Sequence, residues 1–222
     1  MKSEDRLGKS AALGFWTAHT PAMDALYDWL ETTKRGAAVE SELPAGLLEV
    51  WESRSESIGL VIDAAEKDAK KLLTAVGQDF DAEFARGGSP FRAGFRSTRD
   101  PWVLRRIIEP RRGKLPKGPI YFTASIEEGV GEELFIYTNL WSKGGRVAGE
   151  LFMRELREVD DGTIHSYEDW ATGVGVLGRH RLAECMLVGE IDLDQLREVV
   201  RKDFAKQENS LLDGVLRSFR GL

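Results

Sequence analysis

The stretch Ile120–Trp141, which reads IYFTASIEEGVGEELFIYTNLW, carries the clearest β-strand signal of the chain. Apolar residues alternate with more polar ones over 120–126, and the same alternation returns over 134–141. Because successive side chains of a strand point to opposite faces of a sheet, this period of two predicts two strands. The loop between them contains glycines and acids, so the whole stretch predicts an antiparallel hairpin.

A basic segment precedes this hairpin in an otherwise acidic chain. Between Arg92 and Lys117 there are nine basic residues and two acids, a local charge of +7, whereas the whole 222-residue chain carries −6. Prolines interrupt the segment and exclude one long helix, so we expect an irregular connector with two helical turns over 102–108. Aromatic residues, among them Phe95 and Trp102, lie between the arginines.

Positive charge interleaved with aromatic rings is typical of sites that bind single-stranded nucleic acid, where cations follow the phosphates and rings stack on the bases. Arginine also binds phosphate through two parallel hydrogen bonds. The segment therefore predicts a soluble binding or regulatory module for an anionic partner, either nucleic acid or an acidic protein surface. Internal pairing of the arginines with the acidic remainder is the open alternative. The residues predicted to bind are Arg96, Arg99, Arg105, Arg106, Arg111, Arg112 and Lys114.

The residues before the basic segment are predicted to be helical. Thr20 followed by Pro21 marks one helix start, because a hydroxyl cap and a proline in the first turn both favour it. Over Pro44–Val76 the pattern predicts a long amphipathic helix, either a scaffold packed on the fold or the seam of a coiled-coil dimer. Its apolar residues recur every seven positions, at Trp51, Ile58, Ala65 and Leu72, with a companion row at Ile62, Ala69 and Val76.

The residues after the hairpin predict more strands and then helices. Arg146–Val159 fits a helix or two strands, and we expect strands because an isolated hairpin is marginally stable. Asp192 with Gln195 forms a capping box that begins C-terminal helices. The fold prediction is one α+β domain over 1–222, with N-terminal helices, an antiparallel sheet of about four to five strands and C-terminal helices. Its regions are helical (1–90), an Arg-rich connector (91–118), β-rich (119–191) and C-terminal helices (192–222).

A glycine-rich run occurs in the β-rich region. Gly173–Gly178 matches the G-x-G-x-x-G pattern of dinucleotide-binding loops. No strand–helix–strand unit surrounds it, so dinucleotide binding is not predicted and the run indicates a connection within the sheet. Since basic residues follow directly, a secondary phosphate site at Gly175, Arg179 and Arg181 is an alternative.

Two further function classes stay open. Acids on adjacent strands can hold magnesium and activate water, so Glu150, Glu155 and Asp169 indicate a metal-dependent nuclease as one alternative. Arg157 weakens it, because arginine cannot serve as the titrating base that a lysine would supply. Six tryptophans indicate the other alternative, a protein–protein adaptor or a homodimer.

Composition limits the remaining classes. Cys185 is the single cysteine, which excludes an internal disulfide and a cysteine-based zinc site, and its apolar neighbours predict a buried, inert thiol. We predict no cofactor and no metal, and no catalytic motif favours an enzyme. Acids near the N-terminus are unlike a signal peptide, and no apolar run reaches the roughly 18 residues of a membrane span. A cytoplasmic protein that does not enter a membrane is therefore expected.

Overall fold

The computed structural model describes residues 6–34, 47–85, 91–96, 100–110, 120–129, 131–142, 164–167 and 172–206. The helices are α1 (Ala11–Ala18), α2 (Thr20–Lys34), α3 (Leu47–Ala85), the short 3-10 helix η4 (Leu182–Cys185) and α5 (Leu193–Lys206). The strands are β1 (Lys9–Ser10), β2 (Phe91–Arg96), β3 (Val103–Pro110), β4 (Ile120–Glu128), β5 (Leu134–Ser142), β6 (Ile164–Tyr167), β7 (Thr172–Arg181), β8 (Met186–Leu187) and β9 (Glu190–Asp192).

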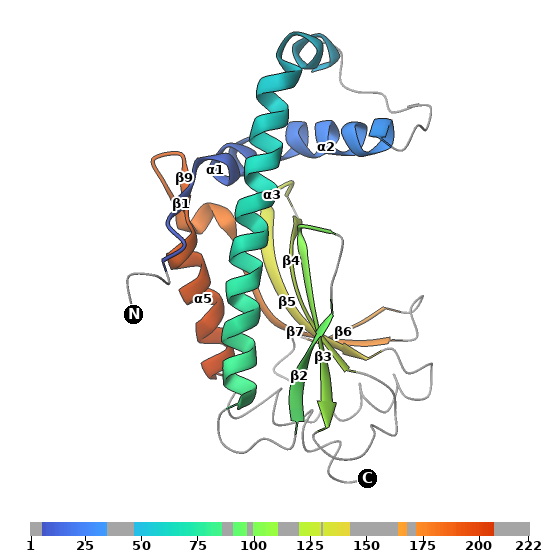
Figure 1. Cartoon of the computed structure of the whole chain (residues 1–222), viewed down its shortest axis with the longest axis vertical. Helices are drawn as coiled ribbons and strands as arrows, with labels where there is room; N and C mark the ends of the chain where they lie inside the picture. Colours follow the sequence, from blue (N-terminus) through green and yellow to red (C-terminus); the bar gives the residue numbers. More distant parts are fainter. Residues whose placement is uncertain are drawn as a thin grey trace.

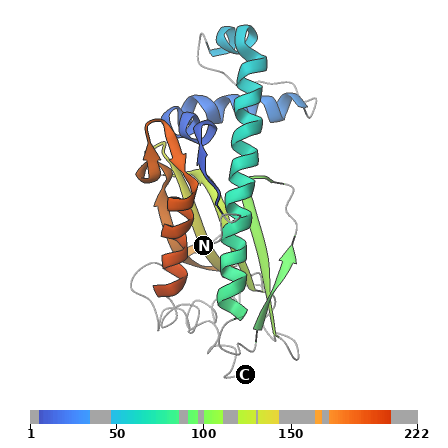
Figure 2. The same cartoon turned by 60° about the vertical axis from the view of Figure 1, so that its left-hand side comes forward.

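The predicted α+β class is confirmed. Among the described residues the main sheet has six strands in the order β2-β3-β4-β5-β7-β6, all antiparallel, where the sequence predicts four or five. A small sheet, β1-β9-β8, joins the N-terminal segment to the strand before α5. Figures 1 and 2 show α3 and α5 side by side on one face of the main sheet, and the N-terminal part of α3 rises beyond it.

The predicted hairpin is confirmed as β4 and β5, and its two faces have different surroundings. Phe122 pairs with Leu140 and Ile126 with Ile136 across the two strands. These residues are buried toward the helices, where the ring of Phe122 stacks on Phe80 of α3 with centroids 3.8 Å apart. Phe122, Ala124 and Ile126 of β4 therefore form part of the core between the sheet and α3.

The long predicted helix is α3, which continues beyond the expected end to Ala85. Ile62, Ala65, Ala69, Leu72 and Val76 are all buried in the core cluster. Because these positions pack against the rest of the same chain, the scaffold prediction is confirmed for this part of α3.

The helical turns predicted over 102–108 are wrong. Val103–Pro110 is the strand β3, which pairs with β2 on one side and β4 on the other. β-branched Val103, Ile107 and Ile108 suit a strand, and pairing on both sides outweighs the weak local helix preference. The expected irregular connector therefore contains two strands of the main sheet, the edge strand β2 and its neighbour β3.

The glycine-rich run is also a strand rather than a connection. Gly173–Gly178 lies within β7, which pairs with β5 and β6. The register between β5 and β7 shifts at Thr138 and Asn139. Glycine suits this strand because a Cβ at Gly178 would overlap the carboxylate of Asp203 on α5.

Both predicted helix starts occur, although one uses its hydroxyl differently. The backbone N–H of Gln195 donates to Asp192 Oδ1 at 2.9 Å, as the predicted cap requires. The Thr20 hydroxyl instead donates to the carbonyl oxygens of Trp16 and Thr17, which precede it in the chain.

Within the described parts of the chain every helix is too short or too polar to span a bilayer. The predictions for 146–159 and for a helix beyond residue 206 lie outside the described residues.

Candidate functional site

The Arg-rich segment is divided between the two faces of the main sheet. Arg96 of β2 lies opposite Arg105 of β3 in the register, and the next residue, Arg106, points to the other face. The other four predicted binding residues, Arg99, Arg111, Arg112 and Lys114, lie outside the described residues.

Arg106 takes part in internal pairing. Its side chain is buried between β3 and α3, with the residue 6% exposed, and its Nε lies 3.3 Å from Asp81 Oδ2. A Cβ at Gly77 of α3 would lie 2.8 Å from its Nη2, so the absence of a side chain at Gly77 makes room for the guanidinium. The alternative of internal pairing therefore holds for this arginine.

Arg105 lies on the opposite face of the sheet, which we call the outer face and define by Arg105, Tyr121, Thr123 and Trp141. Its guanidinium carbon is 5.1 Å from the ring centroid of Trp141. Trp141 in turn stacks on Tyr121 at 4.4 Å and donates from Nε1 to Thr123 Oγ1 at 2.7 Å. One arginine of the segment thus lies beside aromatic rings, but these rings belong to β4 and β5 and not to the segment. Trp102, which lies among the arginines in the sequence, contacts Trp16 and Tyr27 instead.

The secondary phosphate candidates have internal contacts. Arg179 lies over the ring of Phe135 at 4.2 Å. Arg181 bonds to Glu184 at 3.0 Å and to Glu133 at 3.4 Å, which together raise the pKa of its guanidinium. Gly175 lies in strand β7 and not in a loop that could surround a phosphate.

The predicted nuclease site cannot be placed. Glu150, Glu155, Arg157 and Asp169 all lie outside the described residues, so this alternative stays a prediction. Within the described ranges no group of three or more His, Cys, Asp or Glu side chains is arranged to hold a metal ion.

A buried thiol and a partly buried polar pair lie between the sheet and the elements packed on it. Cys185 is buried as predicted; burial raises the pKa of its thiol, and the charges of Asp192 and Glu184 raise it further. His180 of β7 lies with Nε2 2.5 Å from Oδ2 of Asp203, which is 8% exposed on α5. This contact fixes α5 against the sheet.

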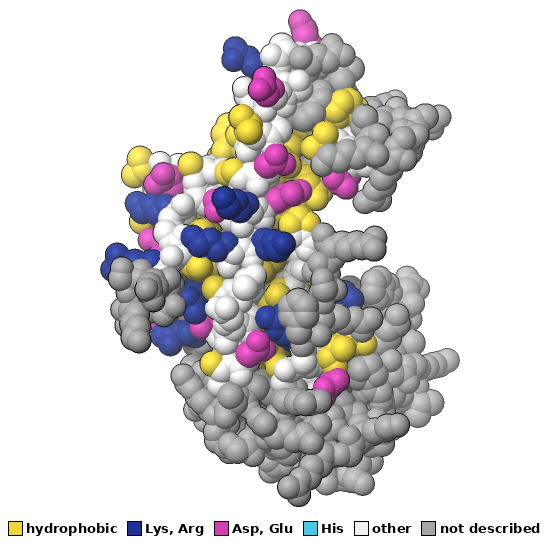
Figure 3. All heavy atoms as spheres, viewed as in Figure 1, with side chains coloured by type: hydrophobic (Ala, Val, Ile, Leu, Met, Phe, Trp, Pro, Cys, Tyr) yellow, Lys and Arg dark blue, Asp and Glu magenta, His cyan; other side chains and the backbone are white. Residues whose placement is uncertain are grey.

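A basic groove lies between the N-terminal segment, α3 and α5, and it contains none of the predicted binding residues. It has a volume of about 410 Å³, and its cations come from all three segments. Figure 3 shows Lys and Arg side chains gathered over the middle of α3 and beside it. The basic groove is lined by Arg6, Leu7, Lys67, Lys70, Lys71, Thr74, Ala75, Gln78 and Arg197.

Two side chains hold the N-terminal wall of the basic groove. Asp194 accepts from the backbone N–H groups of Leu7 and Gly8 at 2.9 and 3.0 Å, and Lys71 Nζ donates to the Leu7 carbonyl oxygen at 2.5 Å. Burial alone would raise the pKa of Asp194. Those two hydrogen bonds and the charges of Arg6 and Arg197 outweigh burial, so the pKa lies below its ordinary value.

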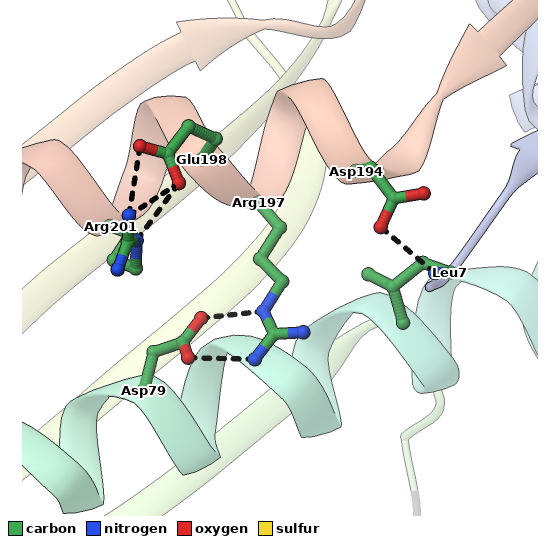
Figure 4. Close-up of polar contacts among 6 residues, drawn as sticks. All are labelled: Leu7, Asp79, Asp194, Arg197, Glu198 and Arg201. Atoms are coloured by element: carbon green, nitrogen blue, oxygen red, sulfur yellow. Dashed lines mark hydrogen bonds and ion pairs between the residues drawn. The ribbon is translucent and has the colours of Figure 1, made fainter. Parts of the chain in front are cut away.

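Arg197 fixes the wall of the basic groove that α5 supplies. It donates from Nε and Nη2 to both carboxylate oxygens of Asp79 on α3, at 2.6 and 2.7 Å. Figure 4 shows Arg197 reaching from α5 to α3, and Asp194 of the same helix α5 contacting Leu7 of the N-terminal segment. Counting the carboxylates of Asp79 and Asp194, which bond to lining residues, the cations of the groove still exceed the acids by three.

The sequence contained part of this site. Lys67, Lys70 and Lys71 share one helix face with Thr74 and Gln78, a spacing that places them on a single stripe. A polar stripe is ordinary on an amphipathic helix, and only the fold brings Arg6 and Arg197 beside it.

Comparison with protein-family models, with curated proteins and with solved structures found no match for the chain.

Proposed function

We propose that this protein is a binding module for an anionic partner, and that the basic groove is its principal contact surface. The observation that carries the proposal is the convergence of five cations from three segments on one groove whose lining contains no carboxylate. Like charges gathered in this way repel one another, and a bound anion offsets that repulsion. The convergence is notable in a chain whose net charge is −6.

The Arg-rich segment supplies a second candidate contact for a polymeric partner. Arg105 presents its charge beside Trp141 and Tyr121 on the outer face. Tyr121 is buried, so the partly exposed Trp141 is the ring of this pair that can contact a base. A ring beside a cation favours single-stranded nucleic acid over an acidic protein surface, because bases stack on rings and carboxylates do not.

Binding of labelled oligothymidylate, polyglutamate and tripolyphosphate tests the proposal, measured by anisotropy or calorimetry at low salt. The proposal expects at least one of these probes to bind. If four groove cations contact phosphates, affinity for the oligonucleotide should fall about 50-fold between about 50 and 200 mM salt.

Matched variants locate the site. Lys67→Gln with Lys70→Gln removes two exposed cations of the basic groove, whereas Arg54→Gln with Lys202→Gln removes two exposed cations elsewhere on α3 and α5. Binding should weaken in the first double variant and stay unchanged in the second. Absence of binding by all three probes, or equal binding by both variants, would contradict the proposal.

A further inference from the structure

We infer that the ligand of the basic groove is a compact molecule with two or more adjacent phosphoryl groups, and not an extended polyanion. This inference rests on the proposed function, since it names the class of anion that the same groove takes. It follows from the shape of the groove, the spacing of its cations and the kinds of side chain that line it.

The shape favours a small ligand. The basic groove has a volume of about 410 Å³. This lies within the range of about 300–1,000 Å³ that is usual for small-molecule sites. Its walls belong to three separate segments, with Arg6 on one side and the α3 lysines and Arg197 on the others. The groove is open to solvent on one side, so it contacts a compact ligand from three segments without enclosing it. An extended backbone, by contrast, is contacted along a continuous surface.

The spacing of the cations favours neighbouring phosphoryl groups. Lys67, Lys70 and Lys71 lie within about one turn of α3, which rises about 5.4 Å per turn. Three lysines within that length of one helix can contact adjacent phosphoryl groups of the same ligand. An ammonium group has three donors, so Lys71 retains two after its bond to Leu7.

The remaining lining residues indicate a ligand that needs no ring recognition. No aromatic side chain lines the groove, and its apolar lining residues are Leu7 and Ala75. The Thr74 hydroxyl donates to the carbonyl oxygen of Lys70 at 2.7 Å, so its proton is already used. Arg6, Lys67 and Lys70 are therefore assigned the direct contacts, and Arg197 contributes its charge.

Titration calorimetry with a series of free anions tests this assignment on the full chain, in low salt and with a chelator present. The probes are orthophosphate, pyrophosphate, tripolyphosphate, adenosine triphosphate and oligothymidylate. Affinity should rise at least about tenfold from orthophosphate to tripolyphosphate, because additional charge-assisted hydrogen bonds form. Adenosine triphosphate should match tripolyphosphate within about threefold, because without an aromatic lining residue the base gains no stacking contact.

The two sources of this chemistry, a nucleotide and an inorganic polyphosphate, are separated by that last comparison. Clearly tighter binding of adenosine triphosphate would show that the nucleoside is also recognised and would overturn the assignment to phosphoryl groups alone. The Lys67→Gln and Lys70→Gln double variant should weaken tripolyphosphate binding at least about tenfold, and the Arg54→Gln and Lys202→Gln double variant by less than about twofold.

Other outcomes distinguish this inference from the proposed function. If oligothymidylate binds through the groove lysines and tripolyphosphate does not, the compact ligand is wrong and the binding module stands. If orthophosphate binds as tightly as tripolyphosphate, the need for adjacent phosphoryl groups is wrong. If no anion binds, both proposals fail. The four substituted side chains are exposed, and circular dichroism of each variant verifies that it is folded.

Discussion

Arg197 and Asp79 join α5 to α3 through two parallel hydrogen bonds, and both side chains are largely shielded from water, at 20% and 15% exposed. Such a forked pair is strong and fixes the orientation of both groups. Arg197 therefore has two roles: it stabilises the contact between the helices, and its charge adds to the basic groove.

Replacing Asp79 with Asn should separate these two roles. The variant removes the negative charge that partly neutralises Arg197, so affinity for an anion in the groove should rise about two- to fivefold. It also weakens two charge-assisted hydrogen bonds, so the free energy of unfolding in urea should fall by about 1–3 kcal/mol. Glu56→Gln, which removes an exposed acid from the same helix, should change neither quantity. Unaltered stability in Asp79→Asn would show that the forked pair does not hold α5.

Arg106→Met should destabilise the fold without affecting anion binding in the basic groove. The variant breaks the contact with Asp81, whose side chain is 41% exposed and can be partly solvated, so we expect a loss of about 1–3 kcal/mol in urea unfolding. Arg105→Met is the matched control, since it removes the same charge from the other face of β3. It should cost about 0.5–1 kcal/mol through the lost contact with Trp141. An equal effect of the two substitutions would contradict the internal role of Arg106.

Gly14→Ala should destabilise the N-terminal part of the fold. A Cβ at Gly14 of α1 would lie 2.8 Å from the carbonyl carbon of Gly189, and this neighbour is backbone that cannot rotate away. We expect a loss of about 1–3 kcal/mol. Gly59→Ala on α3 has open space around the new methyl group and should instead stabilise by about 0.5–1 kcal/mol. Thermal unfolding of both variants measures the difference, and a neutral Gly14→Ala would rule out the tight contact between α1 and the β8–β9 turn.

Asp24 should make stability depend on pH in the acidic range. Burial, with a smaller contribution from Glu128, raises its pKa from 3.8 to about 6, although the hydrogen bond from Trp16 acts in the opposite direction. The folded state therefore binds this proton more tightly than the unfolded chain does. Its contribution to stability is fully present below about pH 4 and is lost as the pH rises through about 6.

Urea unfolding at a series of pH values measures this effect. Asp24 contributes a negative slope of stability against pH between about 4 and 6, so the total slope should become more positive in Asp24→Asn, which keeps the acceptor for Trp16 Nε1 but does not titrate. An unchanged slope in the variant would assign the pH dependence to other groups.

The fold class was predictable because its signals are local. The alternation over 120–141 and the seven-residue rows of α3 each depend on neighbours in the sequence, and both elements occur where the patterns predict them. Val103–Pro110 was not predictable in the same way, since its state is set by pairing with β2 and β4. A strand between two partners gains hydrogen bonds that no local propensity reveals.

The candidate site was less predictable for the same reason. The charge pattern predicts an anion-binding site in the Arg-rich segment. In the structure its adjacent residues Arg105 and Arg106 lie on opposite faces of a sheet. The basic groove gathers charges that are dispersed along the sequence, so no window of the chain contains its five cations. The folded chain brings Arg6, the α3 lysines and Arg197 together in one groove.

The hydrogen bonds that the backbone of Leu7 and Gly8 donates to Asp194 connect positions 187 and 186 residues apart. Contacts of such large sequence separation form slowly, because closing a long loop loses chain entropy before any contact rewards it. During synthesis the groove cannot form until α5 has left the ribosome and met the N-terminal segment. Binding of an anion in the basic groove therefore indicates that the chain has folded as far as α5. A partially synthesised chain has the lysines of α3 but not the complete groove.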